Sequence, residues 1–422
     1  MSNRIIVIAI LAFCACTEPG IDIGDNVHVS SEWAEFPHAE VHLAVNPDDN
    51  DQMLAAAFAY KESGEKDYPA AYISNDGGNT WKRIDIKSPN TGAADPWVIF
   101  QKNRIVYMHT SGMVHISEDQ GKTWTSKRVI TKESGNRLDF IKVVGMENGE
   151  EFYAVATNNL PTDNGPSIDP VTVFKINKEL QVEDSIHILP DSINYKNGIP
   201  VIARESLMIV PFYELLDRKR NLLDEFPIWL AHVDLKDFEI AELIKTPLSG
   251  GEISMTIDSV TNRIHLINPT KVGEAFKLSY AHSDDLGRTW SDPKLIEDFD
   301  RDPGSVILSA SISVTIKGVV GILWPDHRTD PKNEEYGMYF MYSKDGGVTF
   351  SKSYLISEIS SPKTEVNMST LIDNSNRPVG DRFWVGGDYY GLAPVGESSF
   401  QAAWVDSRSG VAQIWTCRLD VR

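Results

Sequence analysis

The sequence predicts an all-β fold, a β-propeller of four-stranded blades, and three observations support this prediction. One octet, Ser-x-Asp-x-Gly-x-Thr-aromatic, occurs four times. Short alternating or apolar runs, separated by Gly, Pro, Asn and Asp, fill most of the 422 residues without sustained helical periodicity. Similar runs return at spacings of about forty to seventy residues, as expected for four-stranded blades with loops of unequal length.

The four octets cover residues 74–81, 117–124, 283–290 and 343–350. In each octet the acidic side chain can bond the amides of its own turn, the glycine supplies backbone angles that other residues resist, and the aromatic residue packs as the next strand begins. We therefore expect four tight turns between strands, all on one face of the molecule. Their acidic residues are Asp76, Asp119, Asp285 and Asp345.

These octets resemble the Asp-box, or BNR repeat, of sialidases and related exported β-propellers. The Asp-box is structural in that family, so the resemblance implies a scaffold and does not locate an active site. Residues 40–47 (EVHLAVNP) resemble the opening blade of such proteins. Residues 387–393 (GDYYGLA), followed by the Trp-x-Asp-x-Arg segment at 404–408, resemble their closing blade.

Strand patterns favour seven blades, with six as the alternative because sialidases are six-bladed. The first unit reads as four strands, at residues 41–46, 53–60, 70–74 and 81–86. Later units align on their third strands. These third strands are expected at residues 114–117, 171–176, 229–233, 278–283, 338–343 and 413–419. The last unit has three clear strands, so an N-terminal strand near residues 26–30 is expected to close the ring and remove an exposed edge.

The N-terminal residues are typical of an export signal. Arg4 precedes an apolar run at residues 5–13, which is too short to span a bilayer, and small residues follow. The segment resembles a bacterial lipoprotein signal with lipid attachment at Cys16, and ordinary secretion is the alternative. We thus expect a signal peptide over residues 1–16, a tether and possible closing strand over 17–30, and one propeller domain over 31–422. We predict that the protein is exported and anchored at the outer surface or in the periplasm.

Charge and cysteine content narrow the possible partners. The net charge of -20 argues against a nucleic-acid partner, which needs a basic surface. Cys417 has no partner in the mature chain, so no internal disulfide is expected. No cluster of His, Cys and carboxylates has metal-ligand spacing, so we expect neither a metal nor a cofactor. The oligomeric state is left open.

Two segments, Trp-Pro-Asp-His-Arg at 324–328 and Trp-Val-Asp-Ser-Arg at 404–408, end second strands of neighbouring blades. One hypothesis is that their arginines converge on an acidic sugar, because guanidinium groups bind carboxylates through two prongs. The other is that each Asp-x-Arg pair ties its own strand end to its neighbour. The first hypothesis names Arg328, Arg382 and Arg408 as substrate-binding residues.

Sialidase chemistry, as the resemblance implies it, uses three arginines on the substrate carboxylate, an aspartate as acid/base, and a tyrosine nucleophile helped by a glutamate. The family's Arg-Ile-Pro segment is missing, and the nearest string is Gly198-Ile199-Pro200. Three functions stay open: a glycoside hydrolase on an acidic oligosaccharide or glycoconjugate, a polysaccharide lyase on uronates, and a non-catalytic binder. The catalytic candidates are Asp326, Asp388 and Asp406 as acid/base, with Tyr389 and Tyr390 as nucleophile.

Other residues near blade entries have ordinary interpretations as well. Glu35, His38 and Glu40 could reach the channel mouth, but surface and strand-entry roles are common for such residues. Asp95 precedes Pro96 and could face the channel, although an aspartate before proline is typical of a turn. His109 ends a second strand and could act as a base, yet a lone histidine is more often a hydrogen-bonded loop residue.

Overall fold

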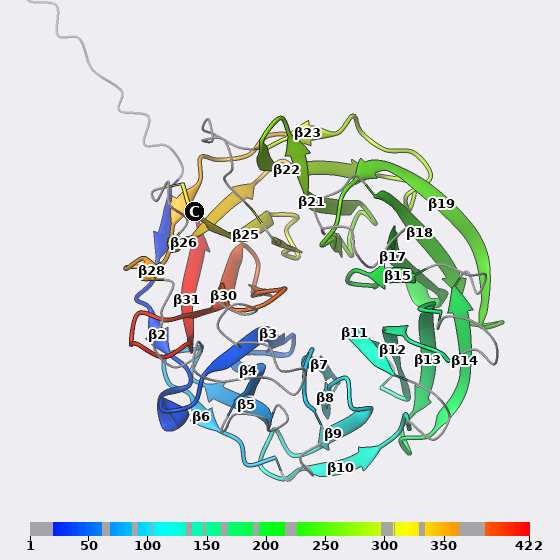
Figure 1. Ribbon diagram of the computed structural model, residues 1–422, viewed down its shortest axis with the longest axis horizontal. Helices are drawn as coiled ribbons and strands as arrows, with labels where there is room; N and C mark the ends of the chain where they lie inside the picture. The colour runs from blue at the N-terminus through cyan, green and yellow to red at the C-terminus, as the bar shows by residue number, and fades with distance from the viewer. Residues whose placement is uncertain are drawn as a thin grey trace, which may run out of the picture.

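A computed structural model of the chain describes residues 20–60, 68–86, 92–102, 104–131, 137–146, 149–161, 168–188, 194–215, 226–296, 307, 309–328, 334–362 and 385–422. These residues form seven antiparallel sheets, each with four principal strands, arranged in a ring (Figure 1). The predicted seven-bladed β-propeller is therefore confirmed, and the alternative of six blades is wrong. In the part of the chain described, no helix is long and apolar enough to cross a membrane.

Each blade runs from the axis of the ring to its rim in four strands. The first strands are β3 (His38–Asn46), β7 (Trp97–Gln101), β11 (Leu138–Gly145), β15 (Asn194–Asn197) with β16 (Val201–Ala203), β20 (Ser254–Ile257), β24 (Ser311–Val314) and β29 (Gly391–Val395). The second strands are β4 (Asp49–Ala59), β8 (Arg104–Met108), β12 (Glu151–Asn158), β17 (Leu207–Leu215), β21 (Ile264–Val272), β25 (Val320–Asp326) and β30 (Ser399–Asp406).

Third strands lie farther from the axis, and fourth strands form the rim. The third strands are β5 (Tyr68–Asn75), β9 (Met113–Ser117), β13 (Val171–Asn177), β18 (Pro227–Asp234), β22 (Ala275–Ser283), β26 (Glu335–Ser343) and β31 (Gln413–Val421). The fourth strands are β6 (Lys82–Arg83), β10 (Thr125–Arg128), β14 (Val182–Ile188), β19 (Glu239–Ser249), β23 (Lys294–Leu295), β27 (Tyr354–Leu355) and β1 (Ile21–Ile23). All seven predicted third strands are confirmed.

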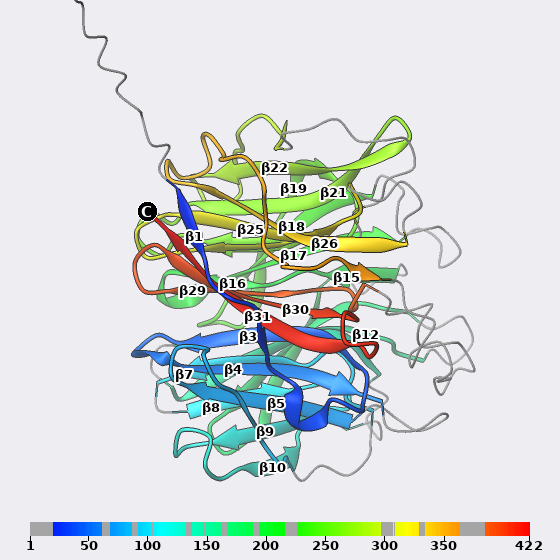
Figure 2. The same ribbon diagram turned by 90° about the vertical axis from the view of Figure 1, so that its left-hand side faces the viewer.

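The N-terminal segment closes the ring, as predicted, by pairing with the last strand of the chain. Strand β1 pairs with β31 in antiparallel register, Ile21 opposite Val421, and the short β2 (Val27–His28) pairs with the same strand. The closing strand thus begins before the predicted residues 26–30. Figure 2 shows β1 beside β31 on the outer side of the ring. Three short elements complete the assignment: β28 (Ser361–Pro362) and the 3₁₀ turns η1 (Ser31–Trp33) and η3 (Arg204–Ser206).

The core is divided among the contacts between neighbouring blades. The described buried residues form seven apolar clusters, and each cluster joins side chains of two adjacent blades. Strands between two neighbours are buried on both faces, which explains why β4 is apolar over the consecutive residues 53–59. Burial between blades, rather than a central core, holds the ring together.

The four octets form the same turn between third and fourth strands. In the turn at residues 283–290, the Ser283 hydroxyl donates to Oδ1 of Asp285 at 2.8 Å, and the hydroxyl of Thr289 donates to Oδ2 at 2.7 Å. The indole N–H of Trp290 donates to the Gly287 carbonyl at 2.8 Å. The two bonds to the aspartate recur in the other three octets, and the indole bond recurs at Trp81 and Trp124, whereas Phe350 in the fourth octet has no such donor. The aspartates of these three octets are Asp76, Asp119 and Asp345.

The octet glycine also brings each blade close to the one before it. Gly347 has a φ of +86°, and a Cβ there would collide with the Tyr280 hydroxyl of the preceding blade. Gly287 and Gly121 approach Leu230 and Ile73 of their preceding blades in the same way. Only glycine allows both the backbone angle and this approach. The octets therefore contribute to packing between blades as well as to the turns.

Candidate functional site

The strand directions place the octet turns and the candidate site at opposite ends of the blades. Connections after first and third strands lie at one end, and those after second and fourth strands lie at the other, because successive strands are antiparallel. At the second end, around the axis, a hollow opens between the starts of the first strands. Its lining includes His42, Trp97, Lys142, Glu252 and Tyr389. The hollow has about 60 Å³ for water-sized molecules, enough for a few waters or one small polar group.

A strained backbone at the blade entries directs side chains into this hollow. Glu40, Asp95, Phe140 and Glu252 all have positive φ, between +49° and +56°. In each case the residue two positions later lines the hollow; these residues are His42, Trp97, Lys142 and Ser254. Glu40 and Phe140 lie at register shifts in β3 and β11, where extra residues bulge from the ladder. Non-glycine residues at positive φ are uncommon and often accompany functional sites.

Hydrogen bonds link the blades in sequence around the hollow. The backbone N–H of Asp95 donates to Oε2 of Glu40 at 2.9 Å, and that of Phe140 donates to Oδ2 of Asp95 at 3.1 Å. The Asn197 side chain then donates to the Phe140 carbonyl at 3.0 Å. The Tyr213 hydroxyl donates to Oε1 of Glu252 at 3.5 Å. These bonds join the first five blades and hold the carboxyl groups in fixed positions.

The remaining blade junctions are also bonded. The backbone N–H of Ile312 donates to the Ser254 hydroxyl at 3.1 Å, and the Ser311 hydroxyl donates to the Tyr390 carbonyl at 2.6 Å. The backbone N–H of Glu40 donates to the Gly386 carbonyl at 2.7 Å, which joins the last blade to the first. All seven blades thus take part in a ring of bonds, and the hollow is a preorganised site.

Two carboxyl groups at the site are held protonated at mildly acidic pH. Burial raises the pKa of Glu252 to about 7, with Lys196 opposing the rise and the negative charge of Asp388 adding to it. Burial likewise raises the pKa of Asp95 to about 7, and Asp139 adds to that rise. Glu252 is half-buried and lines the hollow, whereas Asp95 is only 3% exposed and lies behind the lining.

Lys142 lies in a cage of aromatic rings. Its ammonium nitrogen is 4.0 Å from the ring centre of Tyr389, 4.5 Å from that of Trp97 and 5.8 Å from that of Phe140. The residue is 3% exposed, and Nζ has no hydrogen-bond partner among the described residues. The ring faces attract the cation but accept no ordinary hydrogen bond. Lys142 thus lines the hollow with an ammonium group that has no ordinary hydrogen-bond acceptor among the described residues.

His42 is a neutral donor in this arrangement. Its ring stacks on Trp97 at a centroid distance of 3.6 Å, and the backbone N–H of Val98 donates to its Nδ1 at 3.3 Å. Burial lowers the pKa of His42 to about 3, and the nearby Lys142 charge adds to this effect. Because Nδ1 accepts a bond, the proton of the neutral ring lies on Nε2. His42 is thus suited to donate a hydrogen bond to a ligand and not to act as a base.

The structure brings some of the predicted site residues to the hollow. Asp388, Tyr389 and Tyr390 line it, and Tyr389 and Tyr390 are held by hydrogen bonds to Asp95 and the Val385 carbonyl, respectively. Arg382 lies outside the described residues. His109 is fully buried away from the hollow and bonds His115 at 3.1 Å between their Nε2 atoms, in keeping with the hydrogen-bonded interpretation.

Asp326, Arg328, Asp406 and Arg408 do not line the hollow. In both motifs the tryptophan N–H donates to the aspartate at 2.9 Å, and the arginine forms a 2.7 Å ion pair with that aspartate. The guanidinium groups turn away from the axis, to 3.9 Å from the Tyr339 ring and 4.4 Å from the Trp415 ring on third strands. The structure therefore does not bring these four charges to the hollow that Tyr389 lines, because each pair is directed into its own blade.

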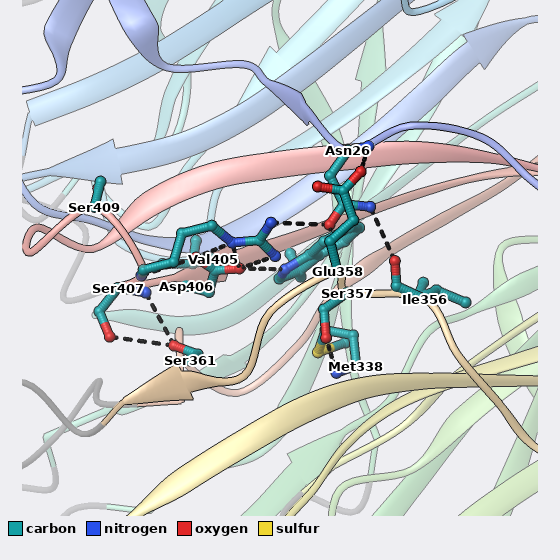
Figure 3. A network of polar contacts seen from close by, with 12 residues as sticks. Asn26, Met338, Ile356, Ser357, Glu358, Ser361, Val405, Asp406, Ser407 and Ser409 are labelled. Carbon is teal, nitrogen blue, oxygen red and sulfur yellow. Dashed lines mark hydrogen bonds and ion pairs between the residues drawn. The ribbon is translucent and has the colours of Figure 1, made fainter.

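The second motif also ties the N-terminal segment to the ring. Nη1 of Arg408 donates to Oδ1 of Asn26 at 2.9 Å, while the Asn26 side chain donates to the Ile356 carbonyl at 2.9 Å. Figure 3 shows Asn26 between Asp406 of the last blade and Ile356 of the sixth. The contacts of Arg408 are thus those of a residue that joins strands.

Sequence reasoning missed Glu252, Lys142 and Tyr213, and gave Asp95 and Glu40 only as weaker candidates. These residues are far apart in the chain and share no local motif. A usable signal was present at the blade entries: Glu40, Asp95 and Glu252 each lie two residues before an inward-facing residue. Aligning the blades on their first strands, rather than on their third, would have placed these carboxylates in register.

Comparisons with known proteins agree with the fold. No protein-family model and no curated protein matches the sequence. Among solved structures, an ulvan lyase described as a new polysaccharide lyase family has a TM-score of 0.56 at 11% identity, over 93% of this chain and 95% of that one. A microbial sialidase has a TM-score of 0.50 at 14% identity, over 94% and 68% of the two chains.

A hydrazine synthase of Kuenenia stuttgartiensis is similar to the same degree, with a TM-score of 0.55 at 10% identity, over 90% of this chain and 96% of that one. At such identities the likeness shows the fold alone. The chain therefore shares a propeller fold with glycan-active enzymes and with an enzyme of unrelated chemistry, so an argument about function must come from the hollow itself.

Proposed function

We propose that this protein is a glycan-active enzyme, a glycoside hydrolase whose reaction takes place at the axial hollow. One observation carries the proposal: Glu252 and Asp388 line the same hollow, and the pKa of Glu252 is raised to about 7. Glycoside hydrolysis in most families uses two carboxyl groups, one protonated and one ionised. When two neighbouring carboxyl groups lie in different environments, their pKa values differ, and this difference determines which one acts as the acid.

Glu252 is the general acid in this proposal. Its carboxyl group gives its proton to the glycosidic oxygen as the bond to the anomeric carbon breaks, and Asp388 supplies the second carboxylate that activates or replaces the attacking water. The sum of the reaction is the glycoside and one water giving two sugars. The Tyr213 hydroxyl, bonded to Oε1, orients the Glu252 carboxyl group. Trp97 and Tyr389 add apolar surface to the lining beside these two carboxyl groups.

The test is a screen of the purified chain against oligosaccharides, read by mass spectrometry, with Glu252→Gln, Asp388→Asn and the surface control Glu242→Gln. We expect hydrolysis products from the parent protein and the control, and a loss of about 10²- to 10⁴-fold in rate for each hollow variant. Activity retained in both hollow variants would exclude this assignment.

A polysaccharide lyase on uronates is the second candidate, favoured by the ammonium of Lys142 at the hollow wall. A lyase neutralises the uronate carboxylate and removes a proton from the adjacent carbon, which leaves an unsaturated sugar. The same mass spectra separate the two reactions, because hydrolysis adds the mass of water and elimination does not.

We also propose that the protein is exported and lipid-anchored at Cys16, on the strength of the short apolar run after Arg4 and the small residues that follow it. Cys16→Ala should then release the protein from the membrane fraction. An unchanged distribution would instead favour plain secretion.

A further inference from the structure

We propose that Lys142 binds the carboxylate of an acidic sugar, so that the hollow selects a glycan with a uronic acid residue over its neutral counterpart. This inference rests on the proposed function and names the substrate class of the same site. Three arguments support it: the burial and hydrogen bonding of the lysine, the size of the hollow, and the charges on the wall of the hollow.

The first argument is that the Lys142 ammonium is buried without a hydrogen-bond partner among the described residues. Burying a charged group is costly unless it is paired and hydrogen-bonded. Three ring faces and distant carboxylates offset part of that cost, but all three N–H donors are left unused. A carboxylate from a ligand would accept from these donors and complete the pairing.

The second argument is the fit of the hollow. Its space of about 60 Å³ accommodates one small polar group and not a complete sugar. The ring of a bound sugar would therefore lie above, with only its carboxylate reaching in. The Tyr389 ring lies on one side of the ammonium, and a small rotation of this ring would widen the approach of a ligand. Its hydroxyl is held to Asp95 by a long bond of 3.4 Å, and its ring packs edge-on against Trp97 at a centroid distance of 5.9 Å.

The third argument is the balance of charge along the wall. When Glu252 is protonated, the lining keeps one basic group, Lys142, and one further acidic group, Asp388; burial lowers the pKa of Lys142, and the nearby carboxylates, Asp95 foremost, oppose that shift. An anionic group can then enter without net repulsion. Glu40 and Asp95 lie behind the wall and His42 is neutral, so Lys142 is the cation on the lining, while Lys196, whose ammonium lies 3.7 Å from the Phe140 ring centre, is a second cation near the site.

The shape of β11 explains how the lysine reaches this position. The strand shifts register between Asp139 and Lys142, and Phe140 within the shift has a φ of +54°. The bulge re-aims the side chain that follows it, so Lys142 points to the axis beside Trp97 of the neighbouring blade. This bulge strains the backbone and buries a lysine, and both features lower the stability of the fold. Ligand binding therefore explains the bulge better than stability does.

The experiment is calorimetric titration of the full chain with methyl β-D-glucuronide, methyl β-D-glucoside and glucose 6-sulfate at pH 6. The variant is Lys142→Met, which keeps the length and removes the charge. The matched control is Lys294→Met, since Lys294 also lies over aromatic rings, those of Tyr280 and Phe350, but on the outer strand β23.

We expect the parent protein and the control to bind the glucuronide at least about tenfold more tightly than the glucoside, and Lys142→Met to lose that preference. The melting temperature of Lys142→Met should be equal or higher, because an unpaired buried charge has been removed, and this separates lost binding from misfolding. Equal binding of both sugars by the parent protein, or a preference that survives in Lys142→Met, would overturn the inference. Equally tight binding of the sulfate ester would overturn the assignment to a carboxylate.

The two proposals fail differently. If the glucuronide binds through Lys142 but no glycoside is cleaved, the proposed hydrolase activity is wrong and the carboxylate site stands. If acidic and neutral glycosides are cleaved at equal rates, the activity stands and the selection by Lys142 is wrong.

Discussion

The hydroxyl of Tyr389 donates to Oδ1 of Asp95 at 3.4 Å, and this bond joins the last blade to the start of the second, across the first. Oδ2 of the same carboxylate accepts the backbone N–H of Phe140 in the third blade. The carboxylate of Asp95 thus connects three blades while the residue is 3% exposed. It positions Tyr389 at the hollow rather than contacting a ligand itself.

Asp95 should make the stability of the protein depend on pH between about 4 and 7. Its folded-state pKa of about 7 exceeds the ordinary 3.8, so the folded protein holds a proton that the unfolded chain has already lost in this window. The free energy of unfolding therefore falls as pH rises from 4 to 7, and the loss is complete above 7. Asp95→Asn should flatten this dependence and raise the melting temperature at pH 8 but not at pH 4. The exposed Asp184→Asn is the control, and identical pH profiles for the parent protein and Asp95→Asn would contradict the prediction.

Glu252 should set the alkaline limit of activity. A general acid works only while protonated, and the pKa of Glu252 in the folded protein is about 7. We expect the rate of hydrolysis to fall about tenfold per pH unit above 7, measured as kcat/KM. Tyr213→Phe removes the hydroxyl bonded to Oε1 and should displace the midpoint of this fall. A profile that stays level to pH 9 would exclude Glu252 as the acid.

Arg408→Lys should destabilise the fold and leave ligand binding unchanged. Arg408 is 5% exposed, pairs with Asp406 at 2.7 Å and bonds Asn26, and lysine cannot reproduce this forked geometry. We expect a loss of about 1–3 kcal/mol in the free energy of unfolding, measured with denaturant. Arg418→Lys is the control, because its pair with Asp420 is 34% and 48% exposed and should contribute less than about 1 kcal/mol. Weaker sugar binding in folded Arg408→Lys would restore the hypothesis that this arginine binds substrate.

Gly347→Ala should cost more stability than Gly273→Ala, although both glycines have positive φ. The backbone strain is similar, about 1–2 kcal/mol in each case. At Gly273 the added methyl meets nothing within 4 Å, whereas at Gly347 it collides with the Tyr280 hydroxyl, which bonds Nδ1 of His265 at 2.7 Å. We therefore expect Gly347→Ala to lose a further 1–3 kcal/mol, roughly, by thermal or denaturant unfolding. Equal losses would show that the octet glycine serves only the turn.

Local chemistry made much of the scaffold predictable. The octet turns depend on residues within eight positions of one another, such as Ser283, Asp285 and Thr289, so a linear pattern specifies them. The third strands precede those turns or occupy equivalent places, and all seven were found. The closing strand followed from a missing partner for the last blade. The predicted residues 26–30 lie after the observed strand, because a paired segment of three residues, 21–23, carries little sequence pattern of its own.

The sequence by itself therefore determined the repeated turn, the strands beside it and the class of fold, because each depends on near neighbours and on the alternation of buried and exposed side chains. Only the tertiary structure decided where the charges meet. Lys142, Glu252 and Asp388 come from three different blades, and ring closure with positive-φ bulges brings them to one hollow. The motifs at Arg328 and Arg408 looked equally suited to a site, but stacking on Tyr339 and Trp415 turns them into the blades. Side-chain direction at a bulge or strand end depends on packing between distant segments, and a linear pattern does not contain it.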